Sequence, residues 1–234
     1  GDEGRDHPRR HALARPAGGA VALTVVLPPP LGEGRGGGAI ATPIRCRFDG
    51  DDAPAAPRVY AVRAGDAPAG TRPEATRTLA RRHARAALVA LLAAELRCAP
   101  EAIVLSEARG QPLRARGHER IGLSVSHERG LSLLALCVAG PVGVDLVVID
   151  RAADHGELRR TAALFLPPRE AAALDELGTR EHQAQAFFHA WARHEARLKC
   201  IGQPLLEWSP AWQTRLADLR TAAVELPDGA GVNY

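Results

Sequence analysis

Apolar residues recur along this chain with two different spacings, and the spacing separates predicted strands from predicted helices. Short runs that alternate or are wholly apolar predict strands, and they occupy residues 20–27, 44–48, 58–63, 103–107, 121–126, 131–138, 142–149 and 221–226. Apolar residues three and four positions apart predict helices over residues 73–96, 156–165, 168–177 and 180–200. The run 131–138 is apolar almost throughout, so we expect a strand that is buried on both faces.

The order of these elements predicts an α/β (α+β) protein made of two similar lobes. A helix followed by strands comes first, and strands followed by helices come second, so we place the lobes at residues 19–120 and 121–234. Residues 1–18 are polar and basic with glycine and proline, and we expect them to be disordered or loosely attached. A chain of 234 residues is long enough to bury a core as one large domain or as two small lobes.

Composition narrows the classes of function. The formal net charge is +3, and arginines cluster at residues 72–85 and 114–120, which indicates either a solvated basic face or a site for an anionic ligand or acidic partner. Aromatic residues make up 4% of the chain, too few for base-stacking platforms, so we expect no nucleic-acid partner. No apolar run reaches membrane-spanning length, and we expect no membrane association.

The four cysteines are scattered along the chain, at Cys46, Cys98, Cys137 and Cys200. None forms a Cys-x-x-Cys pair, which excludes zinc ribbons and dithiol redox motifs. Cys98, Cys137 and Cys200 lie in apolar patterns and are predicted to be buried thiols, as suits the reducing cytoplasm.

The helix predicted at 180–200 carries the most informative group of side chains. Trp191, Glu195 and Lys199 are four residues apart and share one helix face. Upstream, Asp145 ends an apolar strand, where an unpaired carboxylate is costly. A carboxylate and an amine beside a second carboxylate suit a site for a metal ion and a phosphate. The alternatives are an exposed ion pair between Glu195 and Lys199, and an arginine partner for Asp145.

Four short motifs occur in a fixed order along the chain. They are Val125-Ser126-His127, Val142-Gly143-Val144-Asp145-Leu146-Val147, Phe165-Leu166-Pro167-Pro168-Arg169-Glu170 and Trp191-Ala192-Arg193-His194-Glu195-Ala196-Arg197-Leu198-Lys199. In order and spacing they resemble the motifs of the 4′-phosphopantetheinyl transferases of the surfactin-synthetase (Sfp) type. The resemblance covers roughly residues 74–206, and it implies two lobes related by a pseudo-two-fold axis with the active site between them.

The resemblance also implies an activity and its partners. Enzymes of this family move the 4′-phosphopantetheine arm of coenzyme A to a serine of an acyl or peptidyl carrier protein, and they release 3′,5′-ADP. They use Mg²⁺, with Mn²⁺ as the alternative, and they serve fatty-acid, polyketide or nonribosomal peptide biosynthesis. We therefore expect a cytoplasmic, monomeric, Mg²⁺-dependent transferase with coenzyme A as its substrate.

The motifs of the family imply roles for individual residues. Those expected to be catalytic are Asp145, Glu195 and Lys199, the first two as metal ligands. Those expected to contact coenzyme A are Arg77, Gln111, Pro112, Ser126, His127 and Lys199. His127 is assigned to the 3′-phosphate, for which the alternative is a core histidine bonded to the backbone. Arg81 and Arg85 follow Arg77 on the same helix stripe and are interpreted as surface charges.

Three positions depart from the family pattern. Val147 stands where the family has a glutamate, His194 where it has a lysine, and Gln111 where it frequently has a lysine between glycine and proline. Glu128 is a replacement metal ligand, unless it is an exposed turn residue. Because the changes remove one negative and two positive groups, the alternative function is a non-catalytic relative that binds coenzyme A or a carrier domain. A basic regulatory protein is a third class, which rests on charge alone.

Overall fold

The computed structural model describes residues 20–27, 42–50, 52–53, 55–63, 73–106, 111–128 and 130–226. The predicted tail at residues 1–18 lies outside this part of the chain. The strands are β1 (Val21–Leu27), β2 (Ile44–Phe48), β3 (Arg58–Arg63), β4 (Leu105–Ser106), β5 (Arg114–Ala115), β6 (Gly122–Glu128), β7 (Leu131–Cys137), β8 (Val142–Val148) and β9 (Arg220–Glu225). The helices are α1 (Pro73–Leu96), the 3₁₀ helix η1 (Pro100–Ala102), α2 (His155–Phe165), α3 (Pro168–Asp175), α4 (Arg180–Cys200) and α5 (Pro210–Ala217).

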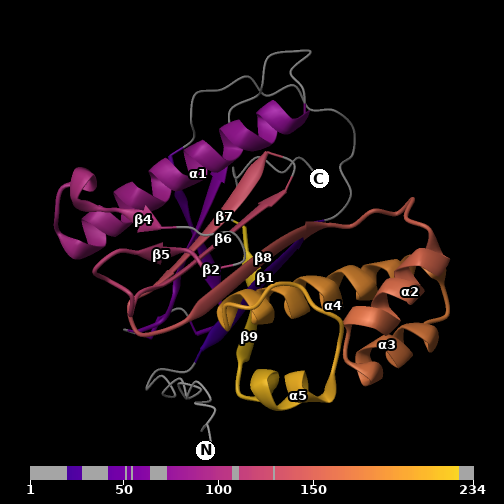
Figure 1. The fold of residues 1–234 in the computed structure, drawn as a ribbon. Coiled ribbons are helices and arrows are strands. Elements are labelled where there is room, and N and C mark those ends of the chain that lie inside the picture. The colour runs from indigo at the N-terminus through magenta and orange to yellow at the C-terminus, as the bar shows by residue number, and fades with distance from the viewer. Residues whose placement is uncertain are drawn as a thin grey trace, which may run out of the picture.

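Seven strands form one mixed sheet in the order β6-β7-β3-β2-β9-β1-β8. Strand β1 pairs in parallel with β8 and β9, and the other pairs in this sheet are antiparallel. Strands β6 and β8 end this order, yet they also lie against each other, because the sheet curves until its two edges meet (Figure 1). The curvature brings residues of β6 and β8 together although no backbone ladder joins these two strands.

Helices cover different parts of this sheet (Figure 1). Helix α1 packs on β3, β6 and β7, whereas α4 packs on β1 and β8 and is itself contacted by α2 and α3. Helix α4 begins where the side chain of Thr179 accepts a hydrogen bond from the backbone N–H of His182, and α2 begins at Asp154 in the same way. No helix in the described part of the chain is long and apolar enough to span a membrane.

The alternation of residues along β8 separates its two faces. Val142, Val144 and Leu146 point into the main apolar core, so the intervening Gly143 and Asp145 lie on the opposite face, toward α4. Strand β7 is buried on both faces along its whole length, which confirms the prediction made from its apolar run. The faces of β8 therefore place the one acidic residue of that strand on the helix side.

The described elements agree with most of the sequence-based boundaries, and the differences have local causes. Helix α5 and strand β5 were not predicted, because the apolar periodicity of both segments is short. The predicted strand at 103–107 forms only two paired residues, as β4. Cys98 was predicted to be buried and is exposed, because it lies in the turn that follows α1; Cys137 and Cys200 are buried as predicted.

The division into lobes was also predicted. The structure is a mixed α and β protein, as expected, and its strand pairing crosses the predicted boundary at residue 120, since β7 pairs with β3 and β9 pairs with β1. The pseudo-two-fold arrangement of two lobes stays a prediction.

Candidate active site

Asp145, Lys199 and Ser126 form a compact group where β8, α4 and β6 meet. The Nζ atom of Lys199 donates to Oδ1 of Asp145 at 2.6 Å and to Oγ of Ser126 at 3.2 Å. The Ser126 hydroxyl in turn donates to Oδ1 of Asp145 at 2.9 Å. Asp145 is 4% exposed, so its carboxylate is stabilised by this ion pair and not by bulk water.

Gly143 allows α4 to approach β8 closely enough for this group to form. A Cβ atom at this position would lie 1.9 Å from the carbonyl oxygen of Ala196 and 2.5 Å from the backbone nitrogen of Cys200. Only glycine fits between the strand and the helix backbone. The glycine two residues before Asp145 therefore fixes how near Lys199 comes to that carboxylate.

Glu195 lies one helical turn before Lys199 and faces the same side of α4. Burial raises the pKa of its carboxyl group, and the nearby Asp145 carboxylate raises it further; Lys199 and a hydrogen bond from Trp191 oppose this. A buried carboxylate whose ionisation is opposed by a neighbouring carboxylate is a common setting for a bound cation.

A cavity of about 800 Å³ opens beside these residues, and we call it the carboxylate cavity. Its polar lining combines carboxylates with cations and comes from Arg77, Arg81, Ser126, His127, Glu128, Asp145, Glu195 and Lys199. Val147 also lines it, so the position at which the family has a glutamate faces this cavity. The structure thus gathers most of the predicted site residues around one space.

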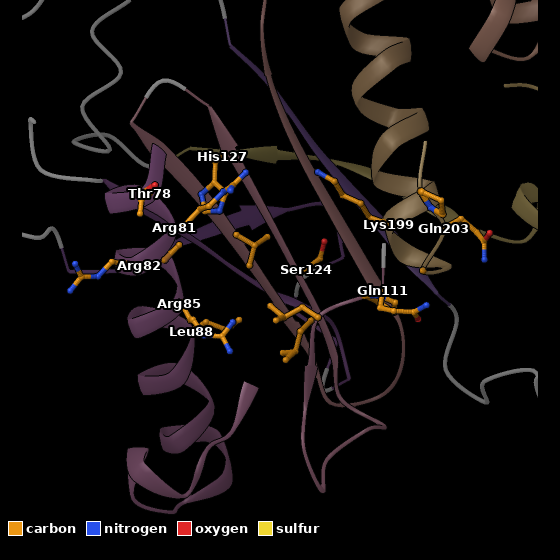
Figure 2. Close-up of a pocket in the computed structure, with 17 residues that line it drawn as sticks. Thr78, Arg81, Arg82, Arg85, Leu88, Gln111, Ser124, His127, Lys199 and Gln203 are labelled. Carbon is orange, nitrogen blue, oxygen red and sulfur yellow. The ribbon is translucent and has the colours of Figure 1, made fainter. Parts of the chain in front are cut away.

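A second cavity of about 630 Å³, which we call the arginine cavity, lies next to the first. The two share Arg81, Val125, His127 and Lys199. Gln111 and Pro112 line the arginine cavity together with Arg82, Arg85 and the segment 202–204 after α4. Figure 2 shows Lys199 extending from α4 toward the side of the cavity where Arg81 and His127 lie. A long anionic ligand has room to run from one cavity into the other.

His127 lies at the junction of the two cavities. Its Nδ1 atom is 2.7 Å from Oγ of the buried Ser132, which leaves Nε2 as the ring nitrogen for a ligand. The surrounding protein lowers the pKa of the imidazole to about 4 by desolvation, and the charges of Arg81 and Lys199 contribute. The ring is therefore neutral at neutral pH, in a place where two cations already favour an anion.

Arg81 and Arg85 were interpreted from the sequence as surface charges, and both are exposed, but they also line cavities of the site, a role that the sequence reasoning did not assign to them. Arg81 lines both cavities and contributes to the lowered pKa of His127. The signal was present in the chain, since Arg77 and Arg81 are four residues apart on one helix face. The sequence did not show which of the arginines faces the cavities.

His194 stands where the family has a lysine, and it lines neither cavity. It is 3% exposed, its ring is tilted against that of Trp208 at 6.2 Å, and Nε2 has no hydrogen-bond partner among the described residues. Burial lowers the pKa of this imidazole. A histidine in place of the family's lysine at this position therefore leaves the cations that line the two cavities unchanged.

Glu170, from the third motif, contacts α4 on a face other than the one that carries Glu195. It accepts a hydrogen bond from Arg193 at 2.7 Å and lies 4.0 Å from Arg197. These contacts tie α3 to α4, so Glu170 helps to fix the helix that carries Glu195 and Lys199.

The residues present fit a magnesium ion held by few protein ligands. Asp145 and Glu195 lie close enough for one to raise the pKa of the other, and Mg²⁺ is commonly held by one or two carboxylates together with phosphate oxygens and water. Within the described residues no group of three or more histidine, cysteine, aspartate or glutamate side chains is arranged to hold a metal ion. Glu128 lines the cavity, and its role as a third ligand stays a prediction that this arrangement does not support.

Comparison with known proteins supports a class of enzyme. Residues 141–229 match the model of a family described as the 4′-phosphopantetheinyl transferase superfamily. No curated protein matches the chain. The matched region contains β8 and α4, and hence Asp145, Glu195 and Lys199, whereas α1 and β6 precede it. The match supports phosphopantetheine transfer as the general activity and coenzyme A as the substrate; it does not distinguish the surfactin-synthetase type.

Proposed function

We propose that this protein transfers the 4′-phosphopantetheine arm of coenzyme A to a serine hydroxyl of an acyl or peptidyl carrier protein and releases 3′,5′-ADP. The observation that carries the proposal is the convergence of two sets of residues on the carboxylate cavity. Asp145, Glu195 and Lys199 come from the region that matches the family, and Arg77, Arg81 and His127 come from outside it. The order of the four motifs supports the surfactin-synthetase type. A cytoplasmic, monomeric enzyme is part of the same proposal.

Each residue has a task in this reaction. Attack of a hydroxyl on the pyrophosphate of coenzyme A builds negative charge on phosphate oxygens, which Lys199 and Arg81 offset from two sides. Arg77 and the neutral Nε2–H of His127 bind further phosphate oxygens, the latter at the 3′-phosphate. Gln111 and Pro112 border the space for the nucleotide. Glu195, with its raised pKa, is suited to accept the proton of the attacking hydroxyl.

A divalent cation belongs to this proposal. When bound, Mg²⁺ or Mn²⁺ neutralises pyrophosphate charge and polarises the phosphorus that is attacked. Asp145 and Glu195 are the residues that would hold it, with phosphate oxygens and water completing the coordination.

The decisive experiment measures transfer directly. Purified protein is incubated with coenzyme A, Mg²⁺ and a panel of apo carrier proteins from fatty-acid, polyketide and peptide synthesis. The molecular mass of each carrier is then measured by mass spectrometry. We expect at least one carrier to gain the mass of the phosphopantetheine arm, and a carrier whose acceptor serine is changed to alanine to gain none. Binding of coenzyme A without transfer to any carrier would favour the non-catalytic alternative that Val147, Gln111 and His194 suggested.

His127 provides a prediction about substrate recognition. His127→Ala should weaken coenzyme A binding about tenfold, because a hydrogen bond to a charged phosphate contributes on the order of 1.5–3 kcal/mol. Dephospho-coenzyme A, which lacks the 3′-phosphate, should lose much less affinity on the same substitution. Calorimetric titration of both ligands measures this, with the exposed His182→Ala as the control. Equal losses for the two ligands would remove His127 from the 3′-phosphate.

A further inference from the structure

Lys199 is the only lysine among the 30 basic residues of this chain, since the other 29 are arginines. A lysine offers a compact charge with three donor hydrogens, whereas an arginine offers a wide planar fork. Two of the three hydrogens of Lys199 are directed to Asp145 and to Ser126. The third is left for the cavities, both of which Lys199 lines. The direction of this donor depends on the two acceptors that hold the ammonium group.

The hydroxyl of Ser126 is fully used within the protein. A serine hydroxyl has one hydrogen to donate and two lone pairs that accept. The hydrogen goes to Oδ1 of Asp145, and the oxygen accepts from Nζ of Lys199 and, at 3.2 Å, from the backbone N–H of Leu146. Since Ser126 is 6% exposed, nothing of its hydrogen-bonding capacity remains for a ligand in this arrangement.

The bond to Leu146 also fixes where Ser126 lies. Strands β6 and β8 have no ladder between them, and the hydroxyls of Ser124 and Ser126 accept the N–H groups of Val144 and Leu146 that a neighbouring strand would otherwise pair. Asp145 lies between these two backbone contacts. Ser124 makes the same kind of contact at 3.0 Å, but no hydrogen bond joins it to Asp145 or Lys199.

We propose that Ser126 is a positioning residue that fastens Asp145 to Lys199 across the junction of β6 and β8, and that it acts through these two residues and not by touching coenzyme A. This inference rests on the proposed function of the site. Its role differs from the ligand contact that the Ser-His motif predicted. Loss of the hydroxyl removes one acceptor from Lys199 and one donor from Asp145, so the ammonium group gains freedom while the other residues that line the cavities stay in place.

The test compares Ser126→Ala with Ser124→Ala, because both lose one bond across the junction and only the first loses the contacts to Asp145 and Lys199. The first readout does not need transfer activity: modification of the single lysine by a small amine-reactive reagent, followed by mass spectrometry of the peptide that contains it. We expect Lys199 to react several-fold faster in Ser126→Ala and at the wild-type rate in Ser124→Ala. The second readout is steady-state transfer, in which Ser126→Ala should lower kcat about tenfold and change KM for coenzyme A much less.

The outcomes separate the proposal from its rivals. A raised KM at unchanged kcat, with normal lysine reactivity, would make Ser126 a ligand contact and overturn the positioning role. Equal behaviour of the two alanine variants would overturn it as well. If the wild type transfers nothing, the proposed function fails, and lysine reactivity still decides whether Ser126 holds Lys199. Ser126→Thr retains the hydroxyl, so Lys199 should be modified as slowly in this variant as in the wild type. This second variant keeps the proposal testable if Ser126→Ala does not fold.

Discussion

Asp145→Asn should lower transfer to a carrier protein by about 10³-fold or more, because it removes the charge that holds a cation at the pyrophosphate. The asparagine keeps the shape of the side chain, and its oxygen still accepts from Lys199 and Ser126. We therefore expect the variant to fold, with a melting temperature within a few degrees of the wild type. The measurement is the initial rate of carrier modification at saturating coenzyme A and Mg²⁺.

The control for this variant lies just beyond the same strand, in the connection from β8 to α2. Asp150→Asn changes an exposed carboxylate that accepts only from the backbone N–H of Ala152 among the contacts of the described residues, at 2.9 Å, and transfer should be unaffected. Excess EDTA should reduce the wild type to the level of Asp145→Asn. Full activity of Asp145→Asn, or of the wild type in excess EDTA, would refute the metal assignment.

Gly143→Ala should destabilise the whole protein and abolish transfer together. The added Cβ would lie 1.9 Å from the carbonyl oxygen of Ala196, which is helix backbone and cannot turn aside as a flexible side chain does. The helix must move off the strand, at a cost of about 3 kcal/mol or more. For a protein of this size that corresponds to a fall in melting temperature of about 6–12 °C. The same movement separates Lys199 from Asp145.

Gly178→Ala is the matched control for this substitution. A Cβ atom at Gly178 meets nothing within 4 Å, so this change should alter the free energy of unfolding by less than about 0.5 kcal/mol. Urea denaturation of both variants measures the difference, and the reactivity of Lys199 reports whether α4 has moved. A Gly143→Ala variant with wild-type stability would show that α4 does not press on β8 as described.

The local spacing of apolar residues was sufficient to predict most of the helices and strands. The continuous apolar run of β7 predicted burial on both faces, and the spacing of Glu195 and Lys199 predicted a shared helix face, because both properties depend only on the geometry of a strand or a helix. The same reasoning failed for Cys98, since its apolar neighbours belong to α1 and the cysteine itself lies in the turn beyond.

The sequence predicted which residues line the candidate site, but it did not predict how their side chains contact one another. Motif order identified Asp145, Glu195, Lys199 and His127, all of which line one cavity. It counted the change from lysine to His194 as a loss of positive charge, although the imidazole of His194 is buried against Trp208 and lines neither cavity. It also did not show that the exposed Arg81 lines both cavities, because the direction of one arginine among several on α1 depends on what packs beside that helix.

The sequence by itself indicated most of the strands and helices, the residues that we expect to carry the chemistry, and the general class of reaction that they suit. Only the tertiary structure showed that the two edges of the sheet meet and that Gly143 sets the distance from α4 to β8. It also showed that the hydroxyl of Ser126 forms hydrogen bonds with Asp145, Lys199 and the backbone of Leu146. The reason is physical: periodicity along a chain reports the environment of each residue, whereas contacts between residues such as Ser126 and Lys199, which are 73 positions apart, depend on how the whole sheet curves.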